Sequence, residues 1–190
     1  MTAFALATRA LPEPADSMRN VLFLCTANSA RSILAEAILR DAAPGRFAAF
    51  SAGSTPRGVP NPLALELLAA KGHAVDGLSS KSWDVFARQG APAMHAVITV
   101  CDNAKGESCP VWPMNPEFGH PVQAHWGIPD PASVAADGTH IDGDLSGFET
   151  AYARLTQRVE AMLALDEDSM TAREWRDALI DIGKQSEGAT

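Results

Sequence analysis

Three kinds of feature are scarce in this chain, and each scarcity narrows what the protein can be. Only three cysteines occur in 190 residues, and they cannot all pair with one another, which favours reduced intracellular thiols over a disulfide framework. No run of 18 apolar residues exists, so we expect no transmembrane helix and no membrane partner. Basic residues number 15 against 23 acidic ones, and the net charge of -8 argues against a nucleic-acid partner. It does not exclude an anionic substrate, because backbone amides can bind an anion locally.

Length and composition otherwise describe an ordinary folded chain. Its 190 residues are 46% hydrophobic and 20% charged, which predicts one globular domain with tails. We divide the chain into a flexible N-terminal tail, a domain and a C-terminal extension: 1–18, 19–167 and 168–190. The apolar stretch 3–7 is too short for a signal peptide, and either Met1 or Met18 can be the start. We therefore expect a cytoplasmic protein, and a monomer.

Strands alternate with helices along the chain. Short apolar runs predict four strands: 21–24, 47–51, 96–100 and 121–126. Apolar residues at helical spacing predict helices: 33–43, 62–71, 81–87 and 148–165. The alternation predicts an α/β fold, a three-layer doubly wound sheet of about four parallel strands with helices on both faces. Such sheets bind ligands at the carboxyl ends of their strands, where Cys25 and Cys101 meet if their strands are neighbours.

The C-terminal extension carries the signals of one short amphipathic helix. Thr171 and Glu174 have the spacing of a capping box, in which each side chain bonds the other residue's backbone N–H. Three apolar residues follow at helical spacing: Trp175, Leu179 and Ile182. The helix should end at Gly183, and we expect it to pack on its own domain rather than on a second copy.

The segment 25–32, Cys-Thr-Ala-Asn-Ser-Ala-Arg-Ser, joins a predicted strand to a predicted helix. A loop in that position can turn its backbone N–H groups around a tetrahedral oxyanion, and Arg31 adds a planar fork for two oxygens. The helix dipole and Arg31 should also lower the pKa of Cys25, which makes it a thiolate nucleophile. The alternative is a structural cysteine beside a solvated arginine. The predicted substrate-binding residues are Thr26, Ala27, Asn28, Ser29, Ala30, Arg31 and Ser32.

The pattern Cys-x-x-Asn-x-x-Arg-Ser after a short apolar strand resembles the low-molecular-weight protein tyrosine phosphatase fold. The resemblance implies that Cys25 is the nucleophile, that Arg31 binds the oxyanion and that a late Asp-Pro pair supplies the general acid. Asp130 precedes Pro131 in that place, and an acid is needed because an oxyanion leaving group is poor until it is protonated. Without the Cys25 loop in the same sequence, we would interpret Asp130 as an ordinary turn residue before proline. Phosphatases of this kind usually have a tyrosine after the pair, whereas this chain has Ala132.

A second stretch resembles arsenate reductases built on the same fold. Cys101 and Cys109 enclose a polar segment, 102–108, that is similar to the redox loop of those enzymes. The runs 111–113, Val-Trp-Pro, and 125–127, His-Trp-Gly, are similar to that family as well. The resemblance assigns residues 19–167 to a phosphatase-like arsenate reductase domain. If the resemblance is set aside, Cys101 is a buried residue at a strand end and Cys109 an unrelated loop residue. The spacing of the two cysteines is too wide for a usual zinc site.

The arsenate reductase resemblance implies a relay of three thiols. Cys25 attacks arsenate while Asp130 protonates the departing hydroxyl, Cys101 then attacks Cys25 and releases arsenite, and Cys109 finally takes over the disulfide with Cys101. Cys101 must reach two partners in turn, so its loop must move. The implied electron donor is thioredoxin, or glutathione with glutaredoxin, and phosphate or sulfate would compete with arsenate. There are two alternatives. One is a phosphatase that acts on phosphotyrosine or small phosphate esters, and the other is a non-catalytic anion or redox sensor.

Potassium is the one cofactor that the resemblance suggests, and no tightly bound cofactor is expected besides it. Some arsenate reductases of this family bind potassium near the oxyanion loop. The matching residues, all with oxygen ligands, are Asn28, Glu36, Ser51 and Asp84. Otherwise Glu36 and Asp84 are surface or capping carboxylates.

Overall fold

Four parallel strands form the centre of the molecule. The computed structural model describes residues 18–101, 110–116, 118–132 and 145–184. The strands are β1 Arg19–Cys25, β2 Phe47–Gly53, β3 Ala96–Thr99 and β4 Val122–His125. Their order is β2-β1-β3-β4 and every pair is parallel, which confirms the predicted sheet and fold class. Residues 1–17 of the tail predicted over 1–18, the segment 102–108 and Cys109 lie outside the described residues.

The central strand is buried on both faces, as its continuous apolar run predicts. Val21 and Phe23 of β1 point into the larger of two apolar clusters, on the side of the long helices. Leu22 and Leu24 point to the opposite side, into a smaller cluster that includes Phe86. Since side chains alternate along a strand, one run of apolar residues supplies both clusters.

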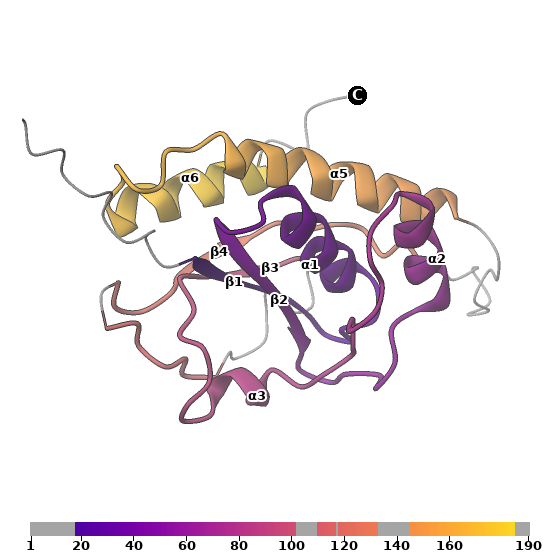
Figure 1. The fold of residues 1–190 in the computed structure, drawn as a ribbon, viewed down its shortest axis with the longest axis horizontal. Coiled ribbons are helices and arrows are strands. Elements are labelled where there is room, and N and C mark those ends of the chain that lie inside the picture. Colours follow the sequence, from indigo (N-terminus) through magenta and orange to yellow (C-terminus); the bar gives the residue numbers. More distant parts are fainter. Residues whose placement is uncertain (1–17, 102–109, 117, 133–144, 185–190) are drawn as a thin grey trace, which may run out of the picture.

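The helices cover the sheet unequally. Their bounds are α1 Arg31–Ala42, α2 Pro62–Ala70, α3 Asp84–Ala87, α5 Ser146–Leu163 and α6 Ala172–Lys184. Figure 1 shows α1, α5 and α6 together on one side of the sheet and α3 on the other. The helix predicted over 81–87 is shorter because Ser82 forms a parallel bridge with Gly53 and begins no helix. Within the described ranges, every helix is too short or too polar to span a lipid bilayer.

The C-terminal helix forms as predicted and packs on its own domain, against β4 and α5. The Glu174 carboxylate accepts the Thr171 backbone N–H at 2.8 Å, and the Thr171 hydroxyl accepts the Glu174 backbone N–H at 3.3 Å. The Trp126 indole N–H donates to the Leu179 carbonyl at 2.9 Å, which ties the helix to the segment after β4. Gly183 lies inside the helix, and a Cβ atom there would stand 2.1 Å from the His125 carbonyl oxygen. Glycine therefore permits the close approach of α6 to β4.

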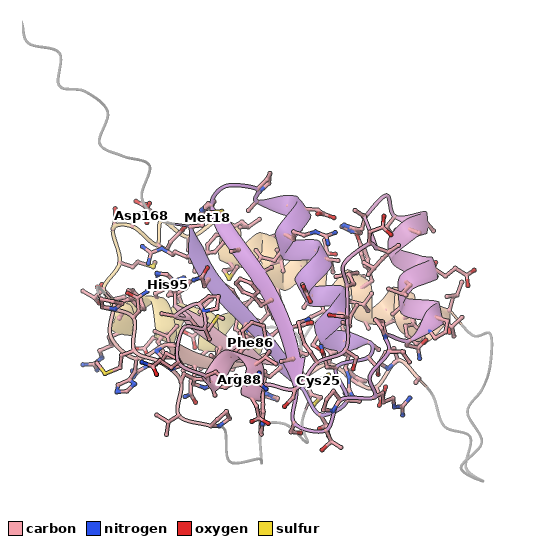
Figure 2. The ribbon with its side chains drawn as sticks, turned by 60° about the horizontal axis from the view of Figure 1, so that its bottom comes forward. Met18, Cys25, Phe86, Arg88, His95 and Asp168 are labelled. Atoms are coloured by element: carbon pink, nitrogen blue, oxygen red, sulfur yellow. The ribbon has the colours of Figure 1, made fainter. Side chains whose placement is uncertain are left out.

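The parallel arrangement brings the ends of β1 and β3 to one edge of the sheet. Strand β1 runs from beside Met18 to Cys25, which lies at the opposite end of the strand (Figure 2). Leu24 pairs with Thr99 across the two strands, so the segment after β3 begins beside the segment after β1. This edge carries the candidate site.

Candidate functional site

The loop after β1 folds back on the sulfur atom of Cys25. The Asn28 backbone N–H donates to Cys25 Sγ at 3.1 Å, and Ser32 Oγ lies 3.0 Å from the same sulfur. Asn28 has a φ of 41°, and it is the one non-glycine among the described residues with a positive φ. This left-handed conformation turns the loop inward and is tolerated by asparagine better than by most residues. Cys25 itself is buried, with 3% of its surface exposed.

The Asn28 side chain is fully buried and holds the loop to three neighbouring segments. Its amide nitrogen donates to Ser32 Oγ and to Ser51 Oγ, both at 2.9 Å. Its carbonyl oxygen accepts the Lys81 backbone N–H at 2.7 Å. All of its hydrogen-bonding groups are therefore used, as a buried amide requires. The loop conformation is fixed before any ligand binds.

Cys101 lies against Cys25 at the floor of the site. It follows the last residues of β3, is 2% exposed, and its sulfur lies 3.8 Å from Thr26 Oγ1. Both described cysteines are free thiols, and they lie close enough for Cys101 to shift the pKa of Cys25. The sheet thus brings together two thiols that are 76 positions apart in the sequence, as their places at neighbouring strand ends predict.

The pKa of the Cys25 thiol is raised well above its ordinary value, so the predicted thiolate is wrong for the free protein. The hydrogen bond with Cys101 is the largest cause, and burial away from water is the second. Ser32 opposes both by donating to the sulfur. The Arg31 guanidinium, which we expected to lower the pKa of Cys25, donates to the Ile128 carbonyl at 3.0 Å and to Asp130 Oδ2 at 3.1 Å.

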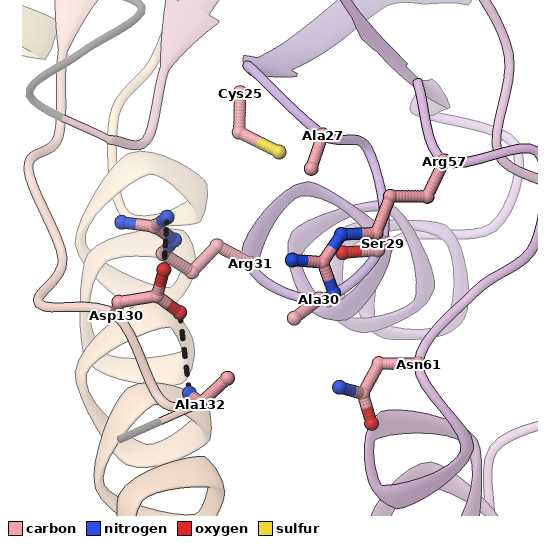
Figure 3. A pocket seen from close by; sticks show the side chains of 9 residues that line it. All are labelled: Cys25, Ala27, Ser29, Ala30, Arg31, Arg57, Asn61, Asp130 and Ala132. Carbon is pink, nitrogen blue, oxygen red and sulfur yellow. Dashed lines mark hydrogen bonds and ion pairs between the residues drawn. The ribbon is translucent and has the colours of Figure 1, made fainter. Parts of the chain in front are cut away.

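Asp130 and Arg31 form the outer side of a cavity of about 280 Å³ whose inner end is Cys25 (Figure 3). Asp130 also accepts the Ala132 backbone N–H at 3.2 Å through Oδ1, and 59% of its side chain is exposed. The carboxyl group can therefore exchange protons with water and still face the cavity. The cavity is lined by Cys25, Ala27, Ser29, Ala30, Arg31, Arg57, Asn61, Asp130 and Ala132.

Among these residues, Arg57 and Asn61 were not predicted from the sequence. Arg57 and Asn61 lie on the segment between β2 and α2, far from both cysteines in the sequence. The signal that was available is weak: Asn61 precedes Pro62 and caps α2, accepting the Leu63 backbone N–H at 2.9 Å. The sequence predicts the helix that begins at Pro62, but not that its start lies beside the cysteine loop.

Three of the four residues expected to bind potassium, Asn28, Ser51 and Glu36, are linked to one another by hydrogen bonds. Ser51 accepts a hydrogen bond from Asn28 and donates one to the Glu36 carboxylate. Asp84 is exposed, and within the described chain it shares no hydrogen bond with the other three. Burial raises the pKa of the Glu36 carboxyl, and the Lys81 ammonium, 3.7 Å from Glu36 Oε2, opposes that rise. These residues fit a resident potassium ion poorly, because a lysine already supplies the cation beside the carboxylate.

The parallel sheet, the cysteine loop after its central strand and the facing aspartate define a phosphatase-like α/β domain. The family model for low molecular weight phosphotyrosine protein phosphatase matches residues 20–172, and the chain therefore belongs to this family. The resemblance read from residues 25–32 is confirmed.

Several curated relatives are named for a different reaction. Arsenate reductase 2 of Staphylococcus saprophyticus is 35% identical over 114 residues, which are 60% of this chain and 79% of that protein. The arsenate reductase of Halalkalibacterium halodurans is 34% identical over 119 residues, 63% of this chain and 77% of its own. A solved arsenate reductase in the phosphate binding state has a TM-score of 0.58 at 26% identity, covering 77% of this chain and 98% of that one. The second resemblance, to arsenate reductases, is confirmed.

Proposed function

We propose that this protein reduces arsenate to arsenite by thiol–disulfide chemistry. The observation that carries the proposal is the contact between two reduced, buried thiols, Cys25 and Cys101, at the inner end of a cavity lined by Arg31 and Asp130. Reduction of arsenic(V) to arsenic(III) takes two electrons, and two thiols that become one disulfide supply two. A phosphatase of this family would need the nucleophile alone. The names of the curated relatives support the same reaction.

The first step joins Cys25 to arsenic. The sulfur attacks the arsenic atom, a sulfur–arsenic bond forms and one arsenic–oxygen bond breaks. The departing hydroxyl takes up the one proton that the Cys25 thiol gives up and leaves as water, and Asp130 is placed to pass that proton on while Arg31 binds the remaining oxygens. Because the pKa of Cys25 is raised in the free protein, the thiol loses its proton in the course of this step rather than before it.

The second step releases arsenite. The Cys101 sulfur attacks Cys25, a disulfide forms and the sulfur–arsenic bond breaks, and its electron pair stays on arsenic. The contact between the two thiols supports this order, since a disulfide needs neighbouring residues. For the third step we rely on the sequence alone: Cys109 attacks Cys101 and regenerates the Cys25 thiol. Thioredoxin, or glutathione with glutaredoxin, would then reduce the disulfide.

The test is one turnover without a reductant. Reduced protein is incubated with arsenate, arsenite is quantified, and disulfides are mapped by mass spectrometry. We expect one arsenite per chain and a disulfide between Cys101 and Cys109. Cys109→Ser should still release one arsenite but stop at a Cys25–Cys101 disulfide, whereas Cys101→Ser should release none. Protein that hydrolyses an aryl phosphate and forms no arsenite would be a phosphatase, and one that does neither would be a sensor.

A further inference from the structure

Arg57 is held at the mouth of the cavity, on the wall that faces Arg31 and Asp130 (Figure 3). The segment that carries it is attached to the cysteine loop by three backbone hydrogen bonds. These run from the N–H groups of residues 55, 57 and 61 to the carbonyls of residues 26, 27 and 29, at 2.9, 3.0 and 2.8 Å. The backbone of Arg57 is therefore fixed relative to the loop even though its side chain is exposed.

The Arg57 guanidinium makes no hydrogen bond or ion pair with any described residue. Arg31, by contrast, is occupied by a carbonyl and by Asp130. Asn61 stands beside Arg57 on the same wall, and its side-chain oxygen is used to cap α2. What remains on this wall is a guanidinium and an amide NH₂ group. Both are hydrogen-bond donors, and neither offers an apolar surface.

A free tetrahedral oxyanion and an aryl ester differ at the mouth of the cavity. When the cysteine loop and Arg31 bind three oxygens, the fourth position points away from Cys25. In free arsenate or phosphate that position holds an oxygen, which accepts hydrogen bonds. In an aryl ester the fourth oxygen is bonded to a ring, which can stack on a guanidinium but accepts no charge-assisted hydrogen bond and removes both donors from water.

We propose that Arg57, with Asn61, is a specificity-determining residue that binds the fourth oxygen and selects unesterified oxyanions over aryl phosphate esters. The proposal rests on the proposed function in that it names the substrate class of the same cavity. A charged, planar donor is suited to an oxyanion oxygen, and its charge adds to that of Arg31. The charged wall also takes the place at which a phosphotyrosine ring would require an apolar contact.

The experiment compares two ligands that are neither reduced nor hydrolysed, inorganic phosphate and phenylphosphonate, by calorimetry on the full chain with reduced thiols. Arg57→Met keeps the length of the side chain and removes its charge. We expect this variant to weaken phosphate binding about tenfold, the effect of losing one charge-assisted hydrogen bond, and to leave the Kd for phenylphosphonate within about twofold. Arg57→Lys should keep part of the phosphate affinity. Asn61→Ser, which retains a capping hydroxyl and removes the amide donor, should weaken phosphate binding by a smaller factor of about three.

The matched control is Arg173→Met, which makes the same charge change on α6, where the side chain is exposed and does not line the cavity. Its two Kd values should equal those of the unmodified protein. An equal loss for both ligands in Arg57→Met would show general attraction without selection, and no loss for either would remove Arg57 from the site. Either result overturns the proposal. Phosphate binding involves no electron transfer, so the outcome is independent of whether arsenate is reduced.

Discussion

At the scale of single residues, the chemistry of the site depends on the contact between two thiols. Cys101 raises the pKa of Cys25 more than burial does, and Ser32 lowers it. Cys101 and burial both favour the protonated thiol of Cys25 in the free protein. In the proposed reaction, the attack on arsenic therefore depends on removal of that proton inside the cavity.

Replacement of Cys101 by alanine should lower the pKa of Cys25, because it removes the largest cause of the rise and leaves the hydrogen bond from Ser32. Alkylation of Cys25 by iodoacetamide, followed by mass spectrometry across a pH series, would measure this. Its midpoint is expected at lower pH in Cys101→Ala than in the unmodified protein, and Cys109→Ala serves as the control of equal size. A midpoint that stays in place or rises would contradict the assignment.

At the scale of secondary structure elements, a polar contact joins three helices. Asp41 of α1 accepts from the His73 ring, which follows α2, at 2.7 Å, and that ring lies 2.8 Å from the Tyr152 hydroxyl of α5. Arg40 also donates to Asp41, at 2.7 Å. The hydrogen bond from Arg40 is the largest cause that lowers the pKa of Asp41 to about 2, and the His73 hydrogen bond adds to it.

Asp41 should therefore contribute to stability above its unfolded pKa and lose that contribution as the pH falls. Its folded pKa of about 2 lies below the ordinary value of 3.8, so the contribution is present above about pH 4 and disappears between there and pH 2. Asp41→Asn should destabilise the protein at pH 7 and show a smaller loss of stability between pH 4 and pH 2, measured by urea unfolding. Asp181→Asn, exposed on α6, is the control. If the free energy of unfolding fell equally between pH 4 and pH 2 in the unmodified and Asp41→Asn proteins, this prediction would be refuted.

At the scale of the whole molecule, the protein carries a net charge of -8, and the proposed substrate is nevertheless an anion. The proposed site is local: two arginines line one cavity at the edge of the sheet, and such a site does not need a basic surface. A ligand that binds only the folded chain stabilises it in proportion to the logarithm of its concentration.

Phosphate should accordingly raise the Tm of the reduced protein in a concentration-dependent way. At a phosphate concentration of one hundred times Kd, the stabilisation is about 2.7 kcal/mol. Arg31→Met should abolish most of this shift, and Arg154→Met, which changes the same charge outside this cavity, should not. Scanning calorimetry at constant ionic strength would separate the specific effect from general salt effects. A Tm that responds equally in both variants would place the anion elsewhere.

The sequence alone determined the parts of the fold that depend on local pattern. Four apolar runs and the helical spacing between them were enough to predict a parallel sheet, because strands buried on both faces carry few polar residues. Thr171 and Glu174 predicted a capped helix because a cap involves only residues within one turn, which lie close together in the sequence. Cys25, Arg31 and Asp130 were recognised because their spacing resembles a known family, and the structure places all three around one cavity.

The tertiary structure decided whatever depends on residues distant in the chain. The direction of the Cys25 pKa shift was mispredicted because the effect of Cys101 depends on contact and burial, neither of which is written in residue spacing. The ion pair of Arg31 with Asp130, 99 positions away, was not predicted, because it depends on how the segment after β4 packs against the cysteine loop. Arg57 entered the site only because β2 lies beside β1 and brings the next segment against the cysteine loop. Hydrophobic pattern fixes which elements form, whereas the electrostatics of the site follow from how those elements pack.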